Sequence, residues 1–456
     1  MAYRLLDGIR IIDLTMVFAG PVATRILADL GAEVIKIESI PRPDTFTRGN
    51  VFPDNVPGDD PWNHGSNFHA LNAGKKGISL NLGDERGRGI FKRLVAISDA
   101  VVENYSPRVM DNWGLGYEEL SKVKSDVIMV SMSGLGHYGP LRDFYMYVPG
   151  MEGMSGLTYA TGRPDAPPLL TGHAYGDWVT GANAAATLLT ALFYRQRTGR
   201  GQYVDVSGRE AVACHLGDVI MEYTLNGRDP PRTGNRDAAA PHGCYRCQGD
   251  DRWVNIAVEN DAQWAALCRA AGHPEWTADA RFATAELRRH YADELDRMIE
   301  DWTSGLQHLE AMRILQAAGV PAGAVLDMRG VNLDPHLHER GFFHAVDHGP
   351  GVGVRPVPSQ LPAKFSGVPS FVPKRAPRFA EDDGYVFGSL LGMSPEEMEA
   401  LARDKVIGGP PSFPRARPTR TDLIEQQGSG WFDADYRVAL QKRYDSYGRR
   451  DDGESR

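Results

Sequence analysis

The strongest candidate for a chemical role is Asp177. It follows Gly176 at the point where a helix rich in small residues is expected to begin. A carboxylate at this position can cap the helix, and the positive end of the helix dipole favours its ionised form. The same carboxylate can act as a nucleophile if the fold points it into a cleft at the carboxyl edge of a parallel sheet. The residue types alone allow both interpretations, a capping aspartate and a catalytic one.

Other candidate groups carry weaker signals. Lys75 and Lys76 end a long segment rich in Pro, Gly and Asp; they form a solvated pair, or bind phosphates if that segment lines a cleft. His137 lies in a glycine-rich turn, where contact with backbone or ligand is favoured over a role as a base. Cys244 and Cys247 have CxxC spacing, but no second pair completes a zinc site and they precede a strand. A metal or redox role is therefore disfavoured.

These side chains need a scaffold, and the sequence before residue 140 predicts one in which strands alternate with helices. Pro21 stands where a helix can begin without losing a hydrogen bond, and Gly31 stands where that helix can end. The expected strands are 9–14, 33–38, 77–82, 100–104 and 127–134. Parallel strands require helical crossovers of this kind, so the pattern predicts a parallel α/β fold. The sequence contains no P-loop, and no GxGxxG motif follows the first strand. The motifs that would indicate a nucleotide-binding site are therefore missing.

Later segments change in character. The segment 41–69 is expected to form a long irregular loop, and residues 226–243 mark a shift to Pro, Arg, Asn and Gly before a smaller domain of about 100 residues. Residues 341–380 are rich in Pro and Val and are expected to be extended. The polar tail after 408 is expected to be a disordered terminus, although WFDADYRVAL could dock as a short amphipathic piece.

The composition narrows the class of protein. The 456 residues carry 50 Lys plus Arg against 59 Asp plus Glu, a net charge of −9, and no sustained basic block indicates nucleic-acid binding. Four cysteines do not make a disulfide framework, and reduced thiols suit a cytosolic setting. The N-terminus lacks the layout of a signal peptide, and the apolar run 184–194 is far shorter than the ~18 residues of a membrane span. We therefore expect a soluble cytoplasmic protein that interacts with neither nucleic acid nor membrane.

Six segments together resemble the family III CoA-transferases, the group that contains formyl-CoA transferase, carnitine CoA-transferase and α-methylacyl-CoA racemase. The segments occur in the family's order and spacing, and weaker similarity continues to about residue 405. They are LLDGIRIIDLTMVFAGPVATRILADLGAEVIKIE (5–38), GKKGISLNL (74–82), DAVVENYSPRVMDNWGLGYEEL (99–120), VIMVSMSGLGHYGP (127–140), GDWVTG (176–181) and RQRTGRGQYVDVS (195–207).

The resemblance implies an α/β architecture in which a large Rossmann-like domain is built from N- and C-terminal parts. These parts correspond to residues 1–225 and 331–407, with a smaller α+β domain at 226–330 and a polar extension at 408–456. It also implies that two chains interlock as a dimer.

The resemblance further implies an enzyme that moves CoA from an acyl-CoA to a carboxylic acid, with Asp177 forming the covalent intermediate. CoA thioesters would be substrates, and no tightly bound cofactor or metal is expected. The residues matched to the CoA site and the active-site entrance are Val17, Lys75, Lys76, Asn104, Tyr105 and Arg108. The chain departs from the family pattern in two positions of this region. Ser106 stands where the family often has a basic residue, for which Arg108, two positions later, is the nearest replacement. Asn112 stands where some members carry arginine. The glycine-rich loop that covers the site in formyl-CoA transferase is not recognisable.

Two alternatives remain open at this point. An acyl-CoA racemase on the same fold needs a histidine as a second proton carrier, and the matching place falls near Tyr147 and Val148, where tyrosine is a poor base at neutral pH. A CoA-binding subunit of a heteromeric transferase is the other alternative. The presence of Asp177 argues against an inert subunit but is compatible with assembly from two related chains.

Overall fold

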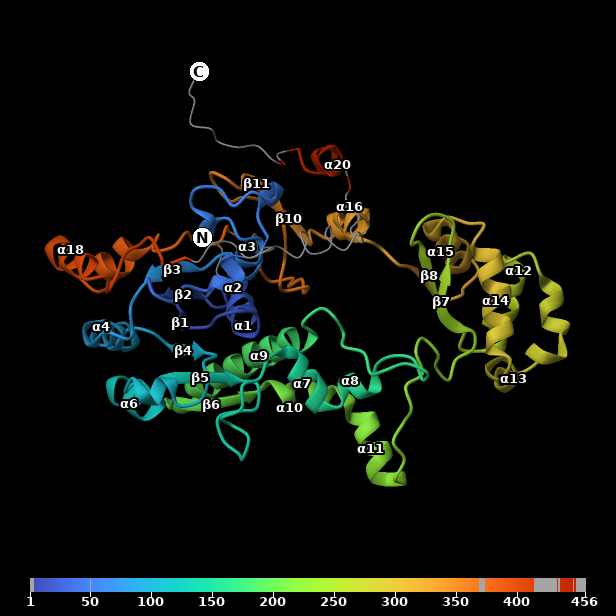
Figure 1. Ribbon diagram of the computed structural model, residues 1–456, viewed down its shortest axis with the longest axis horizontal. Helices are drawn as coiled ribbons and strands as arrows, with labels where there is room; N and C mark the ends of the chain where they lie inside the picture. Colours follow the sequence, from blue (N-terminus) through green and yellow to red (C-terminus); the bar gives the residue numbers. More distant parts are fainter. Residues whose placement is uncertain are drawn as a thin grey trace, which may run out of the picture. The chain divides into compact units, whose positions relative to one another are not determined.

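The computed structural model describes residues 4–49, 51–368, 374–413, 433, 435–445 and 447. Six parallel strands form one sheet in the order β3-β2-β1-β4-β5-β6 (Figure 1). The strands are β1 (Arg10–Asp13), β2 (Glu33–Glu38), β3 (Lys76–Ser79), β4 (Ala100–Glu103), β5 (Ile128–Ser133) and β6 (Gln202–Ser207). The order of the strands reverses between β1 and β4, which is the arrangement of a doubly wound fold. The predicted parallel α/β architecture is therefore confirmed.

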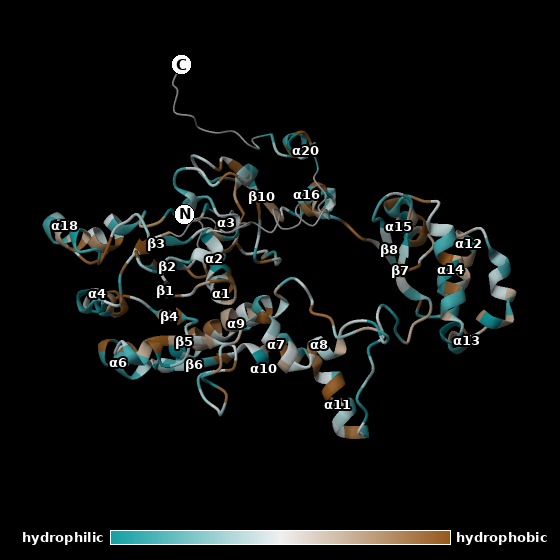
Figure 2. Ribbon diagram, viewed as in Figure 1, coloured by the Kyte–Doolittle hydropathy of each residue, from teal (hydrophilic) through white to brown (hydrophobic). Residues whose placement is uncertain are grey.

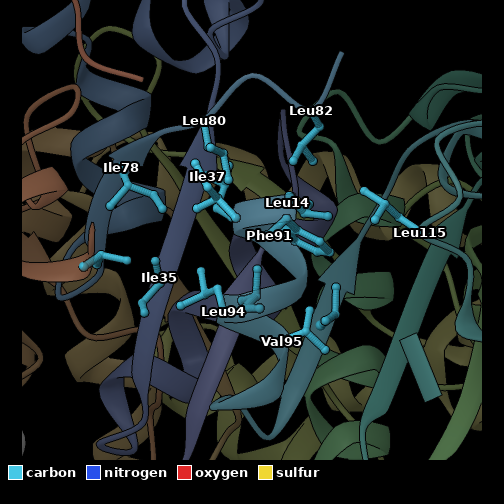
Figure 3. Close-up of a cluster of buried hydrophobic side chains, with 14 of the residues drawn as sticks. Leu14, Ile35, Ile37, Ile78, Leu80, Leu82, Phe91, Leu94, Val95 and Leu115 are labelled. Atoms are coloured by element: carbon cyan, nitrogen blue, oxygen red, sulfur yellow. The ribbon is translucent and has the colours of Figure 1, made fainter. Parts of the chain in front are cut away.

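Alternate residues of the central strands face two separate hydrophobic cores. Ile12 and Ile35 belong to the core on one face, whereas Ile11 and Val34 belong to the core on the other. Figure 3 shows Phe91 of a covering helix packed among the strand residues of the first core. Strands covered on both faces read as continuous apolar runs, and Figure 2 colours β4 and β5 mainly as hydrophobic. Each fully buried side chain of this size contributes about 1.5–3 kcal/mol.

The helices of the N-terminal half follow the predicted alternation with strands. They are α1 (Ala19–Asp29), α2 (Thr45–Arg48), η1 (Pro53–Asn55), η2 (Pro61–Asn63), α3 (Ser66–Asn72), α4 (Glu85–Ala96), α5 (Val109–Asn112), α6 (Tyr117–Val123), α7 (Val148–Ser155), α8 (Leu157–Ala160), α9 (Tyr175–Thr198), α10 (Gly208–Ala213), η3 (Cys214–Leu216) and α11 (Gly217–Asn226). The segment 41–69 is not the irregular loop that the sequence suggests. Short helices interrupt it, because the Asp44 side chain caps α2 and Pro53 and Pro61 begin the turns η1 and η2.

The chain divides into two compact units, of which the second comprises residues 158–169 and 219–332. This unit contains a three-stranded antiparallel sheet, β7-β8-β9, and helices whose apolar side chains cover one core. Its elements are β7 (His242–Arg246), β8 (Trp253–Ala257), α12 (Asp261–Ala270), η4 (Pro274–Ala278), η5 (Ala280–Phe282), α13 (Ala285–His290), α14 (Ala292–Thr303), α15 (His308–Ala317) and β9 (Ala322–Ala324). The domain boundaries expected after residues 225, 330 and 407 stay predictions.

The first unit comprises residues 1–157, 170–218 and 333–456, so its C-terminal part returns to the six-stranded sheet. Val386 and Phe387 enter the same core as β1, β2 and α4. The later elements of the chain are α16 (Met328–Leu333), α17 (Pro335–Glu339), the antiparallel pair β10 (Phe343–Asp347) and β11 (Val354–Pro358), the π-helix η6 (Gly384–Leu390), α18 (Pro395–Arg403) and α20 (Tyr436–Arg443).

Most of the polar C-terminal extension lies outside the described residues, including Trp431 and Phe432 of the segment that could dock. The described part forms α20, and the tyrosines after it, Tyr444 and Tyr447, are buried. Within the described part of the chain, no helix is long and apolar enough to cross a membrane.

Candidate active site at the switch point of the sheet

A cavity of about 360 Å³ lies where the loops that follow β1 and β4 diverge. Parallel strands direct their following loops to one edge, and the point where the strand order reverses leaves a crevice between those loops. Residues 16–19 from the first loop and 104–107 from the second line the cavity. The segment after β5 and the start of α9 complete the wall, which therefore contains Val17, Asn104, Tyr105 and Asp177.

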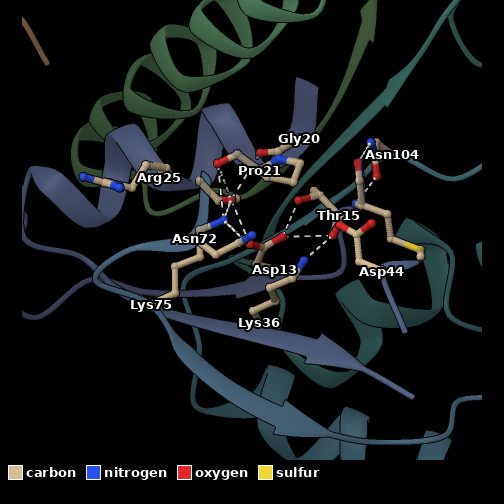
Figure 4. A network of polar contacts seen from close by, with 12 residues as sticks. Asp13, Thr15, Gly20, Pro21, Arg25, Lys36, Asp44, Asn72, Lys75 and Asn104 are labelled. Carbon is tan, nitrogen blue, oxygen red and sulfur yellow. Dashed lines mark hydrogen bonds and ion pairs between the residues drawn. The ribbon is translucent and has the colours of Figure 1, made fainter. Parts of the chain in front are cut away.

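The turn after β1 is held in place by side chains from other elements. The Asn104 amide receives a hydrogen bond from the Met16 N–H through Oδ1 and donates another from Nδ2 to the Met16 carbonyl, both at 2.8 Å (Figure 4). The buried Asp44 carboxylate accepts from the Val17 N–H at 3.0 Å. These contacts fix a Val17 backbone with φ of 66°, a left-handed conformation in which a β-branched residue is an outlier. The turn is thus pre-shaped before any ligand arrives.

Asp177 lies in the first turn of α9 and lines the cavity. It does not cap the helix, because the N-cap is Ala174 and no side chain caps this end. Among the residues that the structure describes, no donor contacts the Asp177 carboxylate. Burial, reinforced by the negative charge of Glu152, raises the pKa of this carboxyl from 3.8 to about 7. The expectation that the helix dipole favours ionisation is therefore outweighed, since desolvation and a like charge both oppose it.

Glu152 fastens the start of α9 to α7. Its buried carboxylate accepts hydrogen bonds from the Thr171 hydroxyl at 2.8 Å and from the Thr171 N–H at 3.2 Å. The Gly176 N–H also donates to it, at 3.4 Å. Glu152 therefore positions the backbone on which Asp177 stands and at the same time places a second carboxylate near it.

The close approach of α1 to α9 sets the distance between Asp177 and the turn after β1. Gly181 makes this approach possible, because a Cβ at this position would lie 2.6 Å from the Ala19 carbonyl and 2.7 Å from Cβ of Val22. Ala184 and Ala185 continue the narrow contact along α9. Small residues at such a crossing let two backbones pack closely, so the sequence GDWVTGANAAA places a carboxylate and a packing surface one after the other.

Comparisons with known proteins bear on the family and the fold of the chain. The sequence profile of CoA-transferase family III matches residues 6–383. The chain is 34% identical over 405 residues to the succinyl-CoA–D-citramalate CoA-transferase of Chloroflexus aurantiacus, which covers 89% of this chain and 98% of that protein. It is 33% identical over 420 residues to the formyl-CoA:oxalate CoA-transferase of Streptomyces avermitilis, which covers 89% and 100% respectively. The solved structure of a CaiB/BaiF family protein from Brucella suis matches with a TM-score of 0.77 at 32% identity, over 86% of this chain and 100% of that chain.

The chain belongs to CoA-transferase family III. The resemblance drawn from the six segments is thus confirmed, and with it the class of enzyme. The switch-point cavity brings together four of the residues expected at the site: Val17, Asn104, Tyr105 and Asp177. The other three, Lys75, Lys76 and Arg108, lie elsewhere.

The Lys75 ammonium is fully buried at the end of β1 rather than on a loop surface. It donates to Asp13 at 2.9 Å, to the Thr24 hydroxyl at 2.7 Å and to the Asn72 amide oxygen at 2.8 Å (Figure 4). Burial lowers the pKa of Lys75 to about 8, while Asp13 opposes the change. Burial alone would raise the pKa of Asp13, but Lys75 and the neighbouring Lys36 hold it below its ordinary value. In this conformation the lysine supports the strand that leads into the turn lining the cavity.

Lys76 and Arg108 keep part of their side chains in solvent. The Lys76 ammonium lies 3.5 Å from Asp382 and 4.3 Å from the centre of the Tyr385 ring. Arg108 donates to Asp143 at 2.7 Å and lines a second cavity, of about 600 Å³, together with His137. The expected contacts of both residues with CoA stay predictions.

His137 and the CxxC pair take no visible part in the cavity of Asp177. The His137 N–H donates to both oxygens of Asp205, at 3.0 and 2.8 Å, which fixes the turn after β5. Cys244 belongs to β7, and Cys247 is buried beside β8. Within the described ranges of the chain, no group of three or more His, Cys, Asp or Glu side chains could hold a metal ion.

Several residues of the site were not found from the sequence. Phe18 packs edge-on against Phe46, with ring centres 5.7 Å apart, and lies 6.3 Å from the ring of Trp178. Glu152 and Asp44 anchor backbone from neighbouring elements. The two phenylalanines and the tryptophan carry no local signal, because their shared position depends on tertiary contacts. A lone glutamate in the glycine-rich run GMEGMSG was the available clue to Glu152.

Proposed function

We propose that this enzyme moves CoA from an acyl-CoA donor to a carboxylic acid acceptor through a covalent intermediate on Asp177. The observation that supports this most is the position of its carboxylate, which is partly buried at the wall of the switch-point cavity. The two relatives named above are CoA-transferases for different acids, so the shared chemistry is CoA transfer rather than one substrate pair. No metal or resident cofactor enters the proposed steps.

The steps balance without ATP or a redox partner. The Asp177 carboxylate attacks the thioester carbonyl, which forms a mixed anhydride and releases CoA thiolate. The thiolate attacks the aspartyl carbonyl, which forms an aspartyl-CoA thioester and releases the donor acid as its carboxylate. The acceptor carboxylate attacks this thioester, and the returning thiolate then attacks the acceptor carbonyl of the new anhydride. Acyl-CoA leaves and the Asp177 carboxylate is regenerated, so the energy of the acyl bond is conserved.

The cavity wall suits these steps. Partial burial removes water from the carboxylate, which protects the anhydride from hydrolysis and leaves a less solvated nucleophile. The positive end of α9 meets the charge that this carboxylate carries when it attacks. Gly134 and Leu135, in the turn after β5, line the same cavity, and backbone N–H groups in such a turn can stabilise the oxyanion of each tetrahedral intermediate.

The same wall favours CoA transfer over racemisation. A racemase needs two groups that exchange the α-proton, whereas no histidine is present among the described residues that line the cavity. Tyr147, near the place where racemases carry that histidine, is mostly exposed and does not supply an imidazole. Asp177 alone can act as a nucleophile, but alone it cannot shuttle a proton between two faces of a carbon.

The CoA contacts of the enzyme are part of the proposal. The exposed part of Lys76 and the guanidinium of Arg108 are free to turn towards phosphates, although each now faces one carboxylate. The backbone of Val17 and the Asn104-Tyr105 turn would face the thioester end of CoA, because both line the cavity of Asp177. Lys75 would act from within the protein by fixing Asp13.

An interlocked homodimer is proposed for the assembly, with a related subunit as the alternative partner. The exposed apolar side chains of α11 support it, since Ile220, Met221, Tyr223 and Leu225 are all about half exposed or more. Contiguous apolar side chains in solvent mark a surface that another chain covers. Sedimentation at nanomolar concentration, read beside circular dichroism through a urea titration, tests this: a folded monomer would refute interlocking.

Trapping of the acylated enzyme tests the proposed chemistry. The protein is incubated with a set of acyl-CoA thioesters, quenched with hydroxylamine or borohydride, and mapped by peptide mass spectrometry. We expect the modification on Asp177, and we expect Asp177→Asn to lose both the modification and at least 10³-fold of the transferase rate, as for a nucleophile acting with its neighbours. Asp218→Asn is the matched control, because Asp218 also lies in the first turn of a helix but is exposed. Near-normal transfer by Asp177→Asn would refute the proposal.

A further inference from the structure

The walls around Asp177 are dominated by apolar and aromatic side chains. Phe18 from the turn after β1, Leu135 from the turn after β5, Phe144 from the loop beyond it and Met151 from α7 all line the cavity. Ligand cavities lined in this way bury the apolar part of their ligands, and a few polar groups orient the rest. The cavity therefore has a chemical preference that the transfer chemistry itself does not require.

Charge in the cavity points in the same direction. Arg142 is the single cationic side chain among the described residues that line it; this side chain is 42% exposed and has Asp143 3.8 Å from its Nε. Asp177 already places one carboxylate on this wall, and the buried Glu152 behind it adds a second negative charge that acts on Asp177. A substrate with a second carboxylate would bring a further negative charge to this wall without a dedicated partner, which is unfavourable in a partly desolvated site.

Phe18 occupies the position that joins these observations. It follows Val17, whose backbone is fixed by Asp44, and its ring contacts those of Phe46 and Trp178. Trp178 is the next residue after Asp177, so the aromatic cluster lies beside the proposed nucleophile. The Phe46 side chain is 48% exposed, which leaves ring surface available to a ligand.

We propose that the acids exchanged by this enzyme carry an aromatic or branched apolar group, and that Phe18 is a specificity-determining residue that selects for it. This inference rests on the proposed function and names the substrate class of the same site. Aromatic rings attract one another when their centres lie about 4.5–7 Å apart, so a substrate ring can join the cluster of Phe18 and Phe46. The class differs from the dicarboxylates named for the relatives of this chain.

The first half-reaction tests the inference without knowledge of the natural acceptor. Wild-type enzyme is mixed separately with phenylacetyl-CoA, isovaleryl-CoA and succinyl-CoA, and the aspartyl-CoA adduct is followed by intact-protein mass spectrometry together with release of the acid. We expect the two apolar thioesters to form the adduct at least ten-fold faster, per unit concentration, than succinyl-CoA. This comparison uses the unmodified protein, so it does not depend on whether a variant folds.

Variants then assign the preference. The quantity compared is the rate of adduct formation with phenylacetyl-CoA divided by the rate with succinyl-CoA. We expect Phe18→Gln to lower this rate ratio at least five-fold, mainly because phenylacetyl-CoA reacts more slowly. Phe193→Gln is the matched control, because Phe193 is a 59% exposed phenylalanine in the second half of α9, and it should keep the wild-type ratio. Circular dichroism verifies that both variants are folded, and Phe46→Leu provides a second, milder change to the same cluster.

The outcomes separate this inference from the proposed function. Adduct formation on Asp177 with succinyl-CoA as fast as with the apolar thioesters would overturn the substrate class while the transferase chemistry stands. An unchanged ratio in both Phe18→Gln and Phe46→Leu would overturn the role of Phe18. Absence of an adduct with every thioester would overturn the proposed function itself, and the inference with it.

Discussion

Replacing Glu152 by glutamine removes one negative charge beside Asp177 while it keeps the size of the side chain. Burial and this charge together raise the pKa of Asp177, the proposed nucleophile, to about 7, so about half of this carboxyl group is protonated at neutral pH. At an effective dielectric constant of about 20, a repulsion of about 1.4 kcal/mol between two carboxylates amounts to one pKa unit. We therefore expect Glu152→Gln to lower the pKa of Asp177 by about one unit, with burial keeping it above 3.8.

The pH dependence of kcat/KM measures this change, because its acidic limb reports the pKa of an essential base in the free enzyme. At pH 6 the ionised fraction of Asp177 should rise from about 9%, for a pKa of 7, to about half, for a pKa of 6. The ratio of kcat/KM at pH 6 to kcat/KM at pH 8 should therefore be roughly five-fold higher in Glu152→Gln than in the wild type. Glutamine can still accept from Gly176 and from the Thr171 hydroxyl, but it cannot accept from the Thr171 N–H through its NH₂ group.

Two further variants separate charge from structure. Glu152→Ala removes the charge and all three hydrogen bonds, so it should lose activity at every pH. Glu210→Gln is the matched control, because Glu210 is exposed in the first turn of the neighbouring helix α10. An acidic limb that stays in place in Glu152→Gln, or moves to higher pH, would refute the idea that Glu152 tunes the nucleophile.

The remaining predictions concern packing, the buried ion pair and the reaction class. Gly181→Ala should destabilise the protein by about 1–3 kcal/mol and lower kcat at least ten-fold, because α9 must move away from α1. Gly89→Ala is the control, because Gly89 faces open space on α4, and it should neither destabilise the protein nor lower kcat. Thermal melting and steady-state rates measure both effects. Lys75→Met should lower the free energy of unfolding by about 3–5 kcal/mol, since it leaves Asp13 buried without its ion-pair partner. Lys76→Ala should change the free energy of unfolding by less than about 0.5 kcal/mol. Calorimetry at low salt should show weaker CoA binding by Lys76→Ala. Equal stability of the two lysine variants would contradict the buried pair. In D₂O without an acceptor acid, proton NMR should show no enzyme-dependent exchange at Cα of a 2-methylacyl-CoA, and rapid exchange would exclude the transferase assignment.

The alternation of strands and helices was readable from the sequence because central parallel strands are buried on both faces. The runs IRIIDL and EVIKIE are apolar enough to indicate strands, and the predicted range 33–38 coincides with β2. Position in a parallel sheet then determines which loops meet, so the pairing of the loops after β1 and β4 follows from strand order. The strand order itself depends on long-range contacts that periodicity does not encode.

The buried ion pair shows where reading by residue type was insufficient. Lys75 and Lys76 are adjacent and look equivalent in the sequence, yet one is fully buried and the other is partly in solvent. The useful signal was on the other strands, where Asp13 and Lys36 interrupt apolar runs. Charged residues inside a two-sided sheet need partners, so their presence in β1 and β2 implied that a nearby lysine points inward.

Two residues near the Asp177 carboxylate have a left-handed backbone: Val17, which lines the same cavity, with φ of 66°, and Ala174, three residues before Asp177, with φ of 51°. Each such conformation costs of order 1–3 kcal/mol in a residue other than glycine, so neither persists unless its surroundings fix it. Asn104 and Asp44 fix the first, and Glu152 holds the chain on both sides of the second. In both places a buried polar side chain from another element forces the backbone into a shape that it would not adopt alone. Asp177 and the turn facing it are thereby held in place by the fold, which would reduce the reorganisation that the transition state of the proposed transfer requires.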